Sequence, residues 1–135
     1  MPRLCLLILC MFSGALAAED MLVAHPSVPM ETIDQLTLRD VFLGRRTTWP
    51  NGQRVVVVLQ RGGEASQRLA GELGKTPQQL INWWKRLVFT GEGTMPEQAE
   101  DGPAMIARIA STPGAIGWVE RAVTAPQGVK ALTPP

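Results

Sequence analysis

One short apolar run, Arg54–Leu59, dominates the hydrophobic pattern of the chain, and four valines stand in a row within it. Valine is β-branched and favours strands, and a run without polar alternation is typical of a strand buried on both faces. Similar composition predicts two further strands, at Met21–His25 and Ala115–Val119, and a short edge strand at Gly128–Leu132. These segments predict a sheet whose central strand is covered by helices on both sides.

Two helices are indicated by their start and stop signals. In the first, Thr37 is predicted to be the N-cap, with an acidic residue three positions later, and Gly44 ends the helix. In the second, Thr76 is the predicted N-cap, Pro77 takes the first helical position, and Gln79 completes a capping box.

Apolar residues at helical spacing predict which side of each later helix faces the core. One helix follows the glycines after the valine run and ends at Gly74, and another starts at Pro103, while Trp83 lies at the edge of the stripe of the helix between them. The predicted inward-facing residues are Ala65, Leu69 and Leu73; Leu80, Trp84, Leu87 and Val88; and Met105, Ile106, Ile109 and Ala110.

The remaining segments are predicted turns and loops. Residues 47–53 hold a proline and an Asn-Gly pair and form a turn, and residues 90–103 read as a polar loop. Strands alternating with helices, without a repeat or a linker, predict one α/β domain of roughly 115 residues.

The first residues are typical of a secretory signal peptide. Arg3 precedes an apolar run, Leu4–Phe12, and the small residues Ala15-Leu16-Ala17 form an A-x-A cleavage site. The run is much shorter than the ~20 residues that a membrane-spanning helix needs. We therefore expect residues 1–18 to be a signal peptide and residues 19–135 to form the exported domain, without membrane insertion.

Charge and cysteine content exclude several functions for the mature chain. Without Arg3, 12 of the 13 basic residues remain and balance the 12 acidic ones, and this neutrality argues against nucleic-acid binding. Both cysteines, Cys5 and Cys10, lie in the signal peptide, so the domain has no disulfide and no thiol nucleophile. His25 is the single histidine and lacks carboxylates at metal-ligand spacing, and no nucleophile elbow is present. We expect no enzyme activity, no metal and no cofactor.

The valine run leads into the strongest candidate binding site. A strand followed by Gly62 and Gly63 and then by a helix presents unpaired backbone N–H groups, which stabilise an anion. Arg61 can clamp such an anion and Ser66 can donate a hydroxyl hydrogen bond. Glu64 is predicted to oppose anion binding, because a carboxylate in the first helical turn caps the helix and repels a second anion.

Four stretches, in order along the chain, resemble the periplasmic phosphate-binding-protein-like family, which has the type II solute-binding fold of phosphate transporters. They are LRDVFLGRRTTWPNGQRVVVV, RGGEASQRL, LVFTGEGT and IASTPGAIGWV. The resemblance implies a single Rossmann-like lobe with a central mixed sheet covered by helices, exported to the periplasm of a Gram-negative bacterium. It also makes Thr47 and Thr48 candidate loop contacts.

The chain departs from this family in two ways. Full-size members have two lobes that close over the ligand, whereas this chain is long enough for one. Phosphate binders of the family carry an Arg, two variable residues and then Gly-Ser-Gly-Thr. Here Arg61 matches, but Glu64-Ala65-Ser66-Gln67 follows the spacer, so that a hydroxyl survives only at a shifted position.

Two functions of different class follow from these patterns. The first is a non-catalytic, periplasmic solute-binding-like protein that takes phosphate or another small anion in connection with phosphate transport or sensing. The alternative is an interaction module that docks on a membrane sensor, channel or transporter without binding solute. The missing lobe and Glu64 favour the alternative, with Trp83 as the candidate interface anchor.

Overall fold

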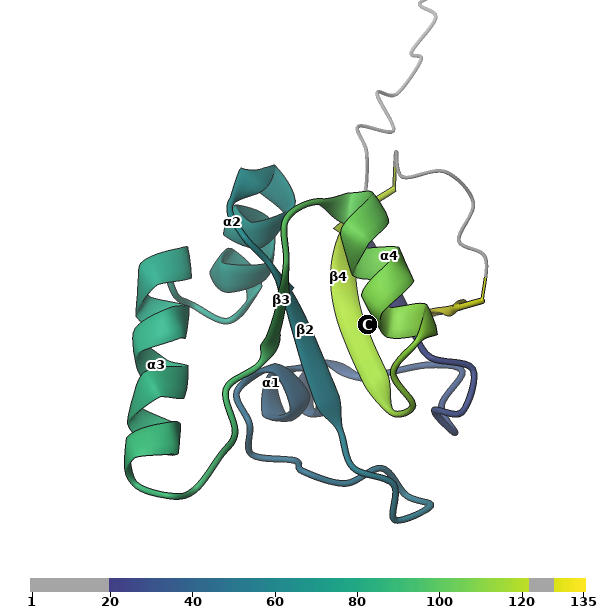
Figure 1. The fold of residues 1–135 in the computed structure, drawn as a ribbon, viewed down its shortest axis with the longest axis horizontal. Helices are drawn as coiled ribbons and strands as arrows, with labels where there is room; N and C mark the ends of the chain where they lie inside the picture. The colour runs from purple at the N-terminus through teal and green to yellow at the C-terminus, as the bar shows by residue number, and fades with distance from the viewer. Residues whose placement is uncertain (1–19, 122–127) are drawn as a thin grey trace, which may run out of the picture.

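The structure is a computed structural model, and it describes residues 20–121 and 128–135. The described residues form five strands and four helices, arranged around one sheet (Figure 1). In chain order they are β1 (Asp20–Ala24), α1 (Gln35–Phe42), β2 (Val56–Gln60), α2 (Gly63–Glu72), α3 (Pro77–Phe89), β3 (Glu97–Ala99), α4 (Gly102–Ala110), β4 (Ala115–Glu120) and β5 (Lys130–Leu132).

The sheet is mixed and has the strand order β3-β2-β4-β1-β5. Strand β2 pairs in parallel with β3 on one side and with β4 on the other, whereas β1 is antiparallel to both β4 and β5. The parallel pairs need long crossovers, which α2 and α3 supply between β2 and β3, and α4 supplies between β3 and β4. The carboxyl ends of three strands therefore meet at one edge of the sheet, beside the start of α2.

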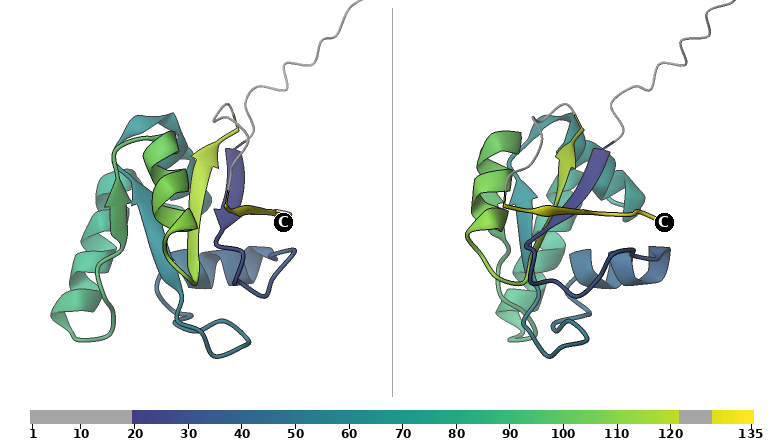
Figure 2. Two further views of the ribbon diagram at one scale, coloured as in Figure 1. Left: turned by 45° about the vertical axis from the view of Figure 1, so that its right-hand side comes forward. Right: turned by 90° about the vertical axis from the view of Figure 1, so that its right-hand side faces the viewer.

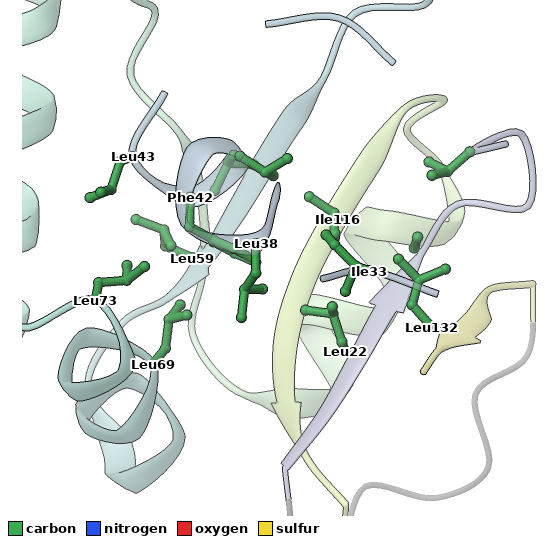
Figure 3. Close-up of a cluster of buried hydrophobic side chains, with 14 of the residues drawn as sticks. Leu22, Ile33, Leu38, Phe42, Leu43, Leu59, Leu69, Leu73, Ile116 and Leu132 are labelled. Carbon is green, nitrogen blue, oxygen red and sulfur yellow. The ribbon is translucent and has the colours of Figure 1, made fainter. Parts of the chain in front are cut away.

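Helices cover both faces of the sheet, as Figure 2 shows. Helix α4 packs on one face, where Val58 of β2 meets Met105 and Ile109. The opposite face carries α1, α2 and α3, and Val57 and Leu59 point into that larger core. In Figure 3, Leu38 of α1 and Leu69 of α2 lie against this face of the sheet, with Leu59 of β2. The valine strand is thus buried on both sides, which confirms the α/β prediction from its unbroken apolar run.

Two of the sequence stretches that carry the family resemblance meet in space. The Trp49 indole is buried, and its Nε1 donates a 2.9 Å hydrogen bond to the carbonyl oxygen of Gly114. Ser27 Oγ accepts a 3.2 Å bond from the Gly114 N–H, and His25 Nδ1 lies 2.7 Å from the same hydroxyl. These bonds join the turn at residues 47–53 to the start of β4, so this part of the resemblance lies in the scaffold.

Three details of the predicted elements were wrong. Helix α1 is capped by Asp34 and not by Thr37: Asp34 Oδ1 accepts a 2.7 Å hydrogen bond from the Thr37 N–H, and hydrogen bonding to Thr37 lowers the pKa of Asp34. Strand β3 forms inside the predicted polar loop, because pairing with β2 satisfies its backbone. Val88 was expected in the core but is 42% exposed.

Helix α3 offers a direct test of the capping signal. Thr76 Oγ1 accepts from the Gln79 N–H at 3.2 Å, and Gln79 Oε1 accepts from the Thr76 N–H at 2.9 Å. We expect Thr76→Ala to lower the free energy of unfolding by about 1 kcal/mol, because one N-terminal N–H loses its partner. Urea denaturation measures the change. Thr76→Ser keeps the hydroxyl and should cost clearly less; equal losses would contradict a capping role.

Candidate functional site

A cavity of about 270 Å³ lies at the carboxyl ends of the parallel strands. It is reached by Gln60 of β2, Gln98 of β3 and Trp118 of β4, and it is closed on one side by the first turns of α2 and α3. Ligands of open α/β sheets bind at this edge, outside the carboxyl ends of the strands. The lining residues are Leu59, Gln60, Arg61, Gly62, Ser66, Leu69, Pro77, Gln78, Leu80, Ile81, Gln98 and Trp118.

The structure places the predicted cradle residues at this cavity. Arg61, Gly62 and Ser66 all line it, and Gly63 follows as the first residue of α2. Gly62 and Gly63 have φ values of 69° and 81°, in the left-handed region that favours glycine. This backbone lets the chain turn sharply from the end of β2 into the helix.

The start of α2 has no side-chain cap, although the other three helices do. Asp34, Thr76 and Asp101 each accept a hydrogen bond from the first turn of their helices, whereas the N-cap Gly62 makes no such bond. The first N–H groups of a helix have no partner within the helix and carry partial positive charge. At α2, the residues on either side of these groups, Gly62 and Ser66, line the cavity.

Arg61 is held in place from β3. Its Nε donates to Gln98 Oε1 at 2.9 Å, and its Nη1 lies 3.1 Å from Glu100 Oε1. The Arg61 side chain is 59% exposed, so its ion pair with Glu100 is open to water. The guanidinium is therefore oriented at the mouth of the cavity, with a carboxylate already beside it.

Glu64 does not cap α2, contrary to our expectation. It makes no cap bond at the start of α2, and it is not among the cavity-lining residues. Its side chain is 83% exposed and turns along the helix to Arg68, with Oε2 3.4 Å from Nη1. The carboxylate is thus solvated and paired with the next turn.

A buried carboxylate fixes the indole that forms one wall. The Asp20 side chain is only 4% exposed and accepts hydrogen bonds from Arg68 Nε at 2.7 Å and Nη2 at 2.8 Å. Its Oδ2 also accepts from Trp118 Nε1 at 2.7 Å. The hydrogen bond to Asp20 raises the pKa of Arg68 above its ordinary value, so the guanidinium stays charged. The network ties β1, α2 and β4 together behind the cavity.

Sequence reasoning missed four polar or aromatic lining residues: Gln60, Gln78, Gln98 and Trp118. Gln60 could have been found, because it ends the valine strand directly before the cradle. The other three come from α3, β3 and β4, and no local pattern in the sequence links them to residues 61–66.

The second pair of candidates lies elsewhere. Thr47 lines a larger cavity of about 420 Å³ at the amino end of β2, together with Arg46, Arg54 and the loop at residues 91–97. The backbone of Thr48 forms a bridge with Arg54. Neither threonine lines the cavity that holds Arg61, so the structure does not bring the two candidate sets together.

Trp83 is not an exposed anchor. It is partly buried against the main core, its Nε1 donates to the Leu43 carbonyl oxygen at 2.8 Å, and Lys75 Nζ lies 4.9 Å from its ring centroid. Among the described residues, the exposed aromatic residue is Phe89, which is 92% accessible at the end of the same helix.

Two further properties bear on the classes of function considered. Within residues 20–121 and 128–135, no three histidine or acidic side chains gather closely enough to hold a metal ion. Over the same residues, the helices are too short or too polar to cross a bilayer.

Sheet order and helix placement are those of a single α/β lobe of the type II periplasmic binding protein fold. No protein-family model and no curated protein matches the sequence. Among solved structures, a protein from Clostridium perfringens assigned as a phosphate ABC transporter substrate-binding protein, with bound phosphate, is similar with a TM-score of 0.67. The similarity covers 87% of this chain and 45% of that chain, at 15% sequence identity.

Two further solved structures have a similar fold. PstS from Borrelia burgdorferi gives a TM-score of 0.63 at 12% identity, over 87% of this chain and 47% of that chain. An ABC-type phosphate transport receptor from Vibrio cholerae gives a TM-score of 0.59 at 12% identity, over 87% of this chain and 46% of that chain. The likeness to phosphate transporter substrate-binding proteins is therefore confirmed as a likeness of fold, and this chain spans less than half the length of each.

Proposed function

We propose that the protein is a non-catalytic, exported binding protein that holds phosphate or another small anion at the cavity beside α2. The observation that carries this proposal is the convergence of Arg61, Gly62 and Ser66 on one cavity, at a helix start without a side-chain cap. The fold of substrate-binding proteins, one of them solved with phosphate, supports it.

The three groups have complementary roles in this proposal. Backbone N–H groups of the first turn of α2 donate to the anion, and the partial charge of the helix start favours its negative charge. Arg61 provides a charge-assisted hydrogen bond, and the Ser66 hydroxyl, one turn into the helix, adds a neutral donor. This lobe contacts the anion from one side, whereas closure of two lobes adds contacts from the other side.

In the cell, we place the protein in the periplasm and link it to phosphate transport or sensing. The predicted signal peptide and the likeness of fold to proteins of phosphate transport support this assignment.

Calorimetric titration with inorganic phosphate and with sulfate tests the proposal. We expect Arg61→Ala to weaken binding by about tenfold to a hundredfold, because it removes a charge-assisted hydrogen bond of roughly 1.5–3 kcal/mol. Arg108→Ala is the matched control, because Arg108 is half-exposed and paired with Glu97 at 3.6 Å but does not line the cavity. No heat at millimolar anion, or equal losses in both variants, would contradict the proposal.

A docking module is the second candidate function, with Phe89 in place of Trp83 as the candidate anchor residue. Phe89 is 92% exposed and the neighbouring Val88 is 42% exposed, and an exposed aromatic residue is a common anchor of protein interfaces. Phe89→Ser should abolish capture of a membrane protein partner while leaving anion binding intact. If capture were unaffected by the substitution, Phe89 would not be the anchor.

A further inference from the structure

We infer that the cavity beside α2 takes an organic anion with an apolar body and a hydrogen-bond donor, in preference to a bare inorganic ion. This inference rests on the proposed function and names the class of ligand for the same site. Four properties of the cavity carry it: its size, its apolar lining, its charge and one buried acceptor.

The cavity is larger than an inorganic anion requires. Its volume is about 270 Å³. A tetrahedral oxyanion displaces about as much as two or three water molecules, or roughly 60–90 Å³ at ~30 Å³ per water. An ion seated on the first turn of α2 would therefore leave most of the space for another group.

That space is lined mainly by carbon. Leu59, Leu69 and Leu80 are each 4–5% exposed and belong to the main core, and they form the inner part of the lining. The Trp118 indole forms a wall whose position is set by its hydrogen bond to Asp20. Ile81 and Pro77 of α3 complete the apolar part. Burial against such a surface stabilises an aliphatic or aromatic group. It does not compensate an ion for the water molecules that the ion loses on binding.

The charge of the cavity suits a singly charged head group. Arg61 is the one charged side chain among the described residues that line it, and its Nη1 is 3.1 Å from Glu100 Oε1. A dianion would gain little net attraction from a cation that is already paired. A monoanion can share the guanidinium with Glu100 and use the N–H groups of α2.

The Gln60 side chain indicates that the ligand carries a hydrogen-bond donor. Its Oε1 is buried and accepts no hydrogen bond from the described residues. A buried acceptor without a partner costs stability, and such groups in proteins are usually explained by a function. Gln60 ends β2 and lines the cavity, so a rotation of its amide would turn this oxygen toward the cavity, where a ligand O–H or N–H beside the anionic group would satisfy it.

The experiment compares three probes by calorimetry at pH 5.5: inorganic phosphate, phenyl phosphate and benzyl alcohol. At this pH a phosphate monoester is largely singly charged and carries a P–O–H donor, because its second pKa is about 6. We expect phenyl phosphate to bind at least tenfold more tightly than inorganic phosphate, because its ring is buried against the leucines and Trp118. Benzyl alcohol, which lacks the anion, should bind far more weakly than phenyl phosphate.

Two variants tie the effect to this cavity. Ile81 is only partly buried, so Ile81→Ser should leave the fold intact and reduce the preference for phenyl phosphate over inorganic phosphate by about fivefold to tenfold. Gln60→Leu should weaken phenyl phosphate binding severalfold while leaving the melting temperature equal or higher. A glutamine kept for structure alone would instead lower the melting temperature when replaced.

The outcomes separate the two proposals. Equal affinity for inorganic and phenyl phosphate overturns the organic-anion inference and leaves the proposed function standing. Binding of neither anion overturns both. Tighter binding of phenyl phosphate that neither variant changes overturns the assignment to this cavity, and equal binding of benzyl alcohol overturns the role of the anionic group.

Discussion

Gly114→Ala is expected to lower the free energy of unfolding by about 3 kcal/mol or more. Gly114 has a φ of 80°, and the left-handed region costs a residue with a side chain about 1–2 kcal/mol. An added Cβ would also collide with the backbone carbonyl oxygen of Arg54. The residue cannot shift easily, because its carbonyl oxygen accepts from Trp49 Nε1 at 2.9 Å and its N–H donates to Ser27 Oγ at 3.2 Å. Urea denaturation measures the loss.

Two glycines provide matched controls for this substitution. Gly52 has a similar φ of 83° but open space where a Cβ would lie, so Gly52→Ala should cost about 1–2 kcal/mol, from the backbone alone. Gly71 lies inside α2 with no close neighbour, and Gly71→Ala should stabilise the protein by about 0.5–1 kcal/mol. If Gly114→Ala lowered the free energy of unfolding no more than Gly52→Ala does, the close contact between residues 54 and 114 would be contradicted.

Asp20→Ala is expected to lower the melting temperature by roughly 5–10 °C. The substitution removes the acceptor of three hydrogen bonds, two from Arg68 and one from Trp118, at a site that is almost closed to water. Hydrogen bonds to charged groups contribute more than neutral ones, and a loss of 1 kcal/mol shifts the melting temperature of a small domain by several degrees. Differential scanning calorimetry measures the shift, and a change in tryptophan emission would report the released indole.

Glu64→Ala is the control for this prediction, because Glu64 pairs with the same arginine. Its carboxylate is 83% exposed and 3.4 Å from Arg68 Nη1, one helical turn away. Exposed ion pairs of this kind stabilise proteins little, so we expect Glu64→Ala to shift the melting temperature by at most about 2 °C. Equal shifts in the two variants would show that burial of Asp20 does not matter.

The features that could be predicted from the sequence are those specified by residues close together in the chain. The capping box of Thr76 and Gln79 is formed within one helical turn, and the valine run specifies a strand buried on both faces through its own side chains. The strand, the two glycines and the helix of the cradle are contiguous, so Arg61 and Ser66 could be placed together before any tertiary contact was known.

Predictions were wrong where neighbours decide the outcome. The three residues of β3 have no apolar alternation, and they form a strand because β2 presents a free edge to them. Val88 has the right helical phase for the core but lies at the end of α3, where its side chain is left exposed. Glu64 has the right position to cap α2, yet its carboxylate pairs with Arg68 in the next turn of the helix.

By itself, the sequence determined the α/β class, the order of most elements and the position of the candidate cradle, because these depend on local periodicity, capping and turn residues. Only the tertiary structure decided what completes the cavity: Gln98 from β3, Trp118 from β4 and the first turn of α3. It also decided that Glu64 points away and that the acceptor of Gln60 is buried without a partner among the described residues. The physical reason is that side-chain direction and burial at the cavity depend on packing between elements distant in the chain.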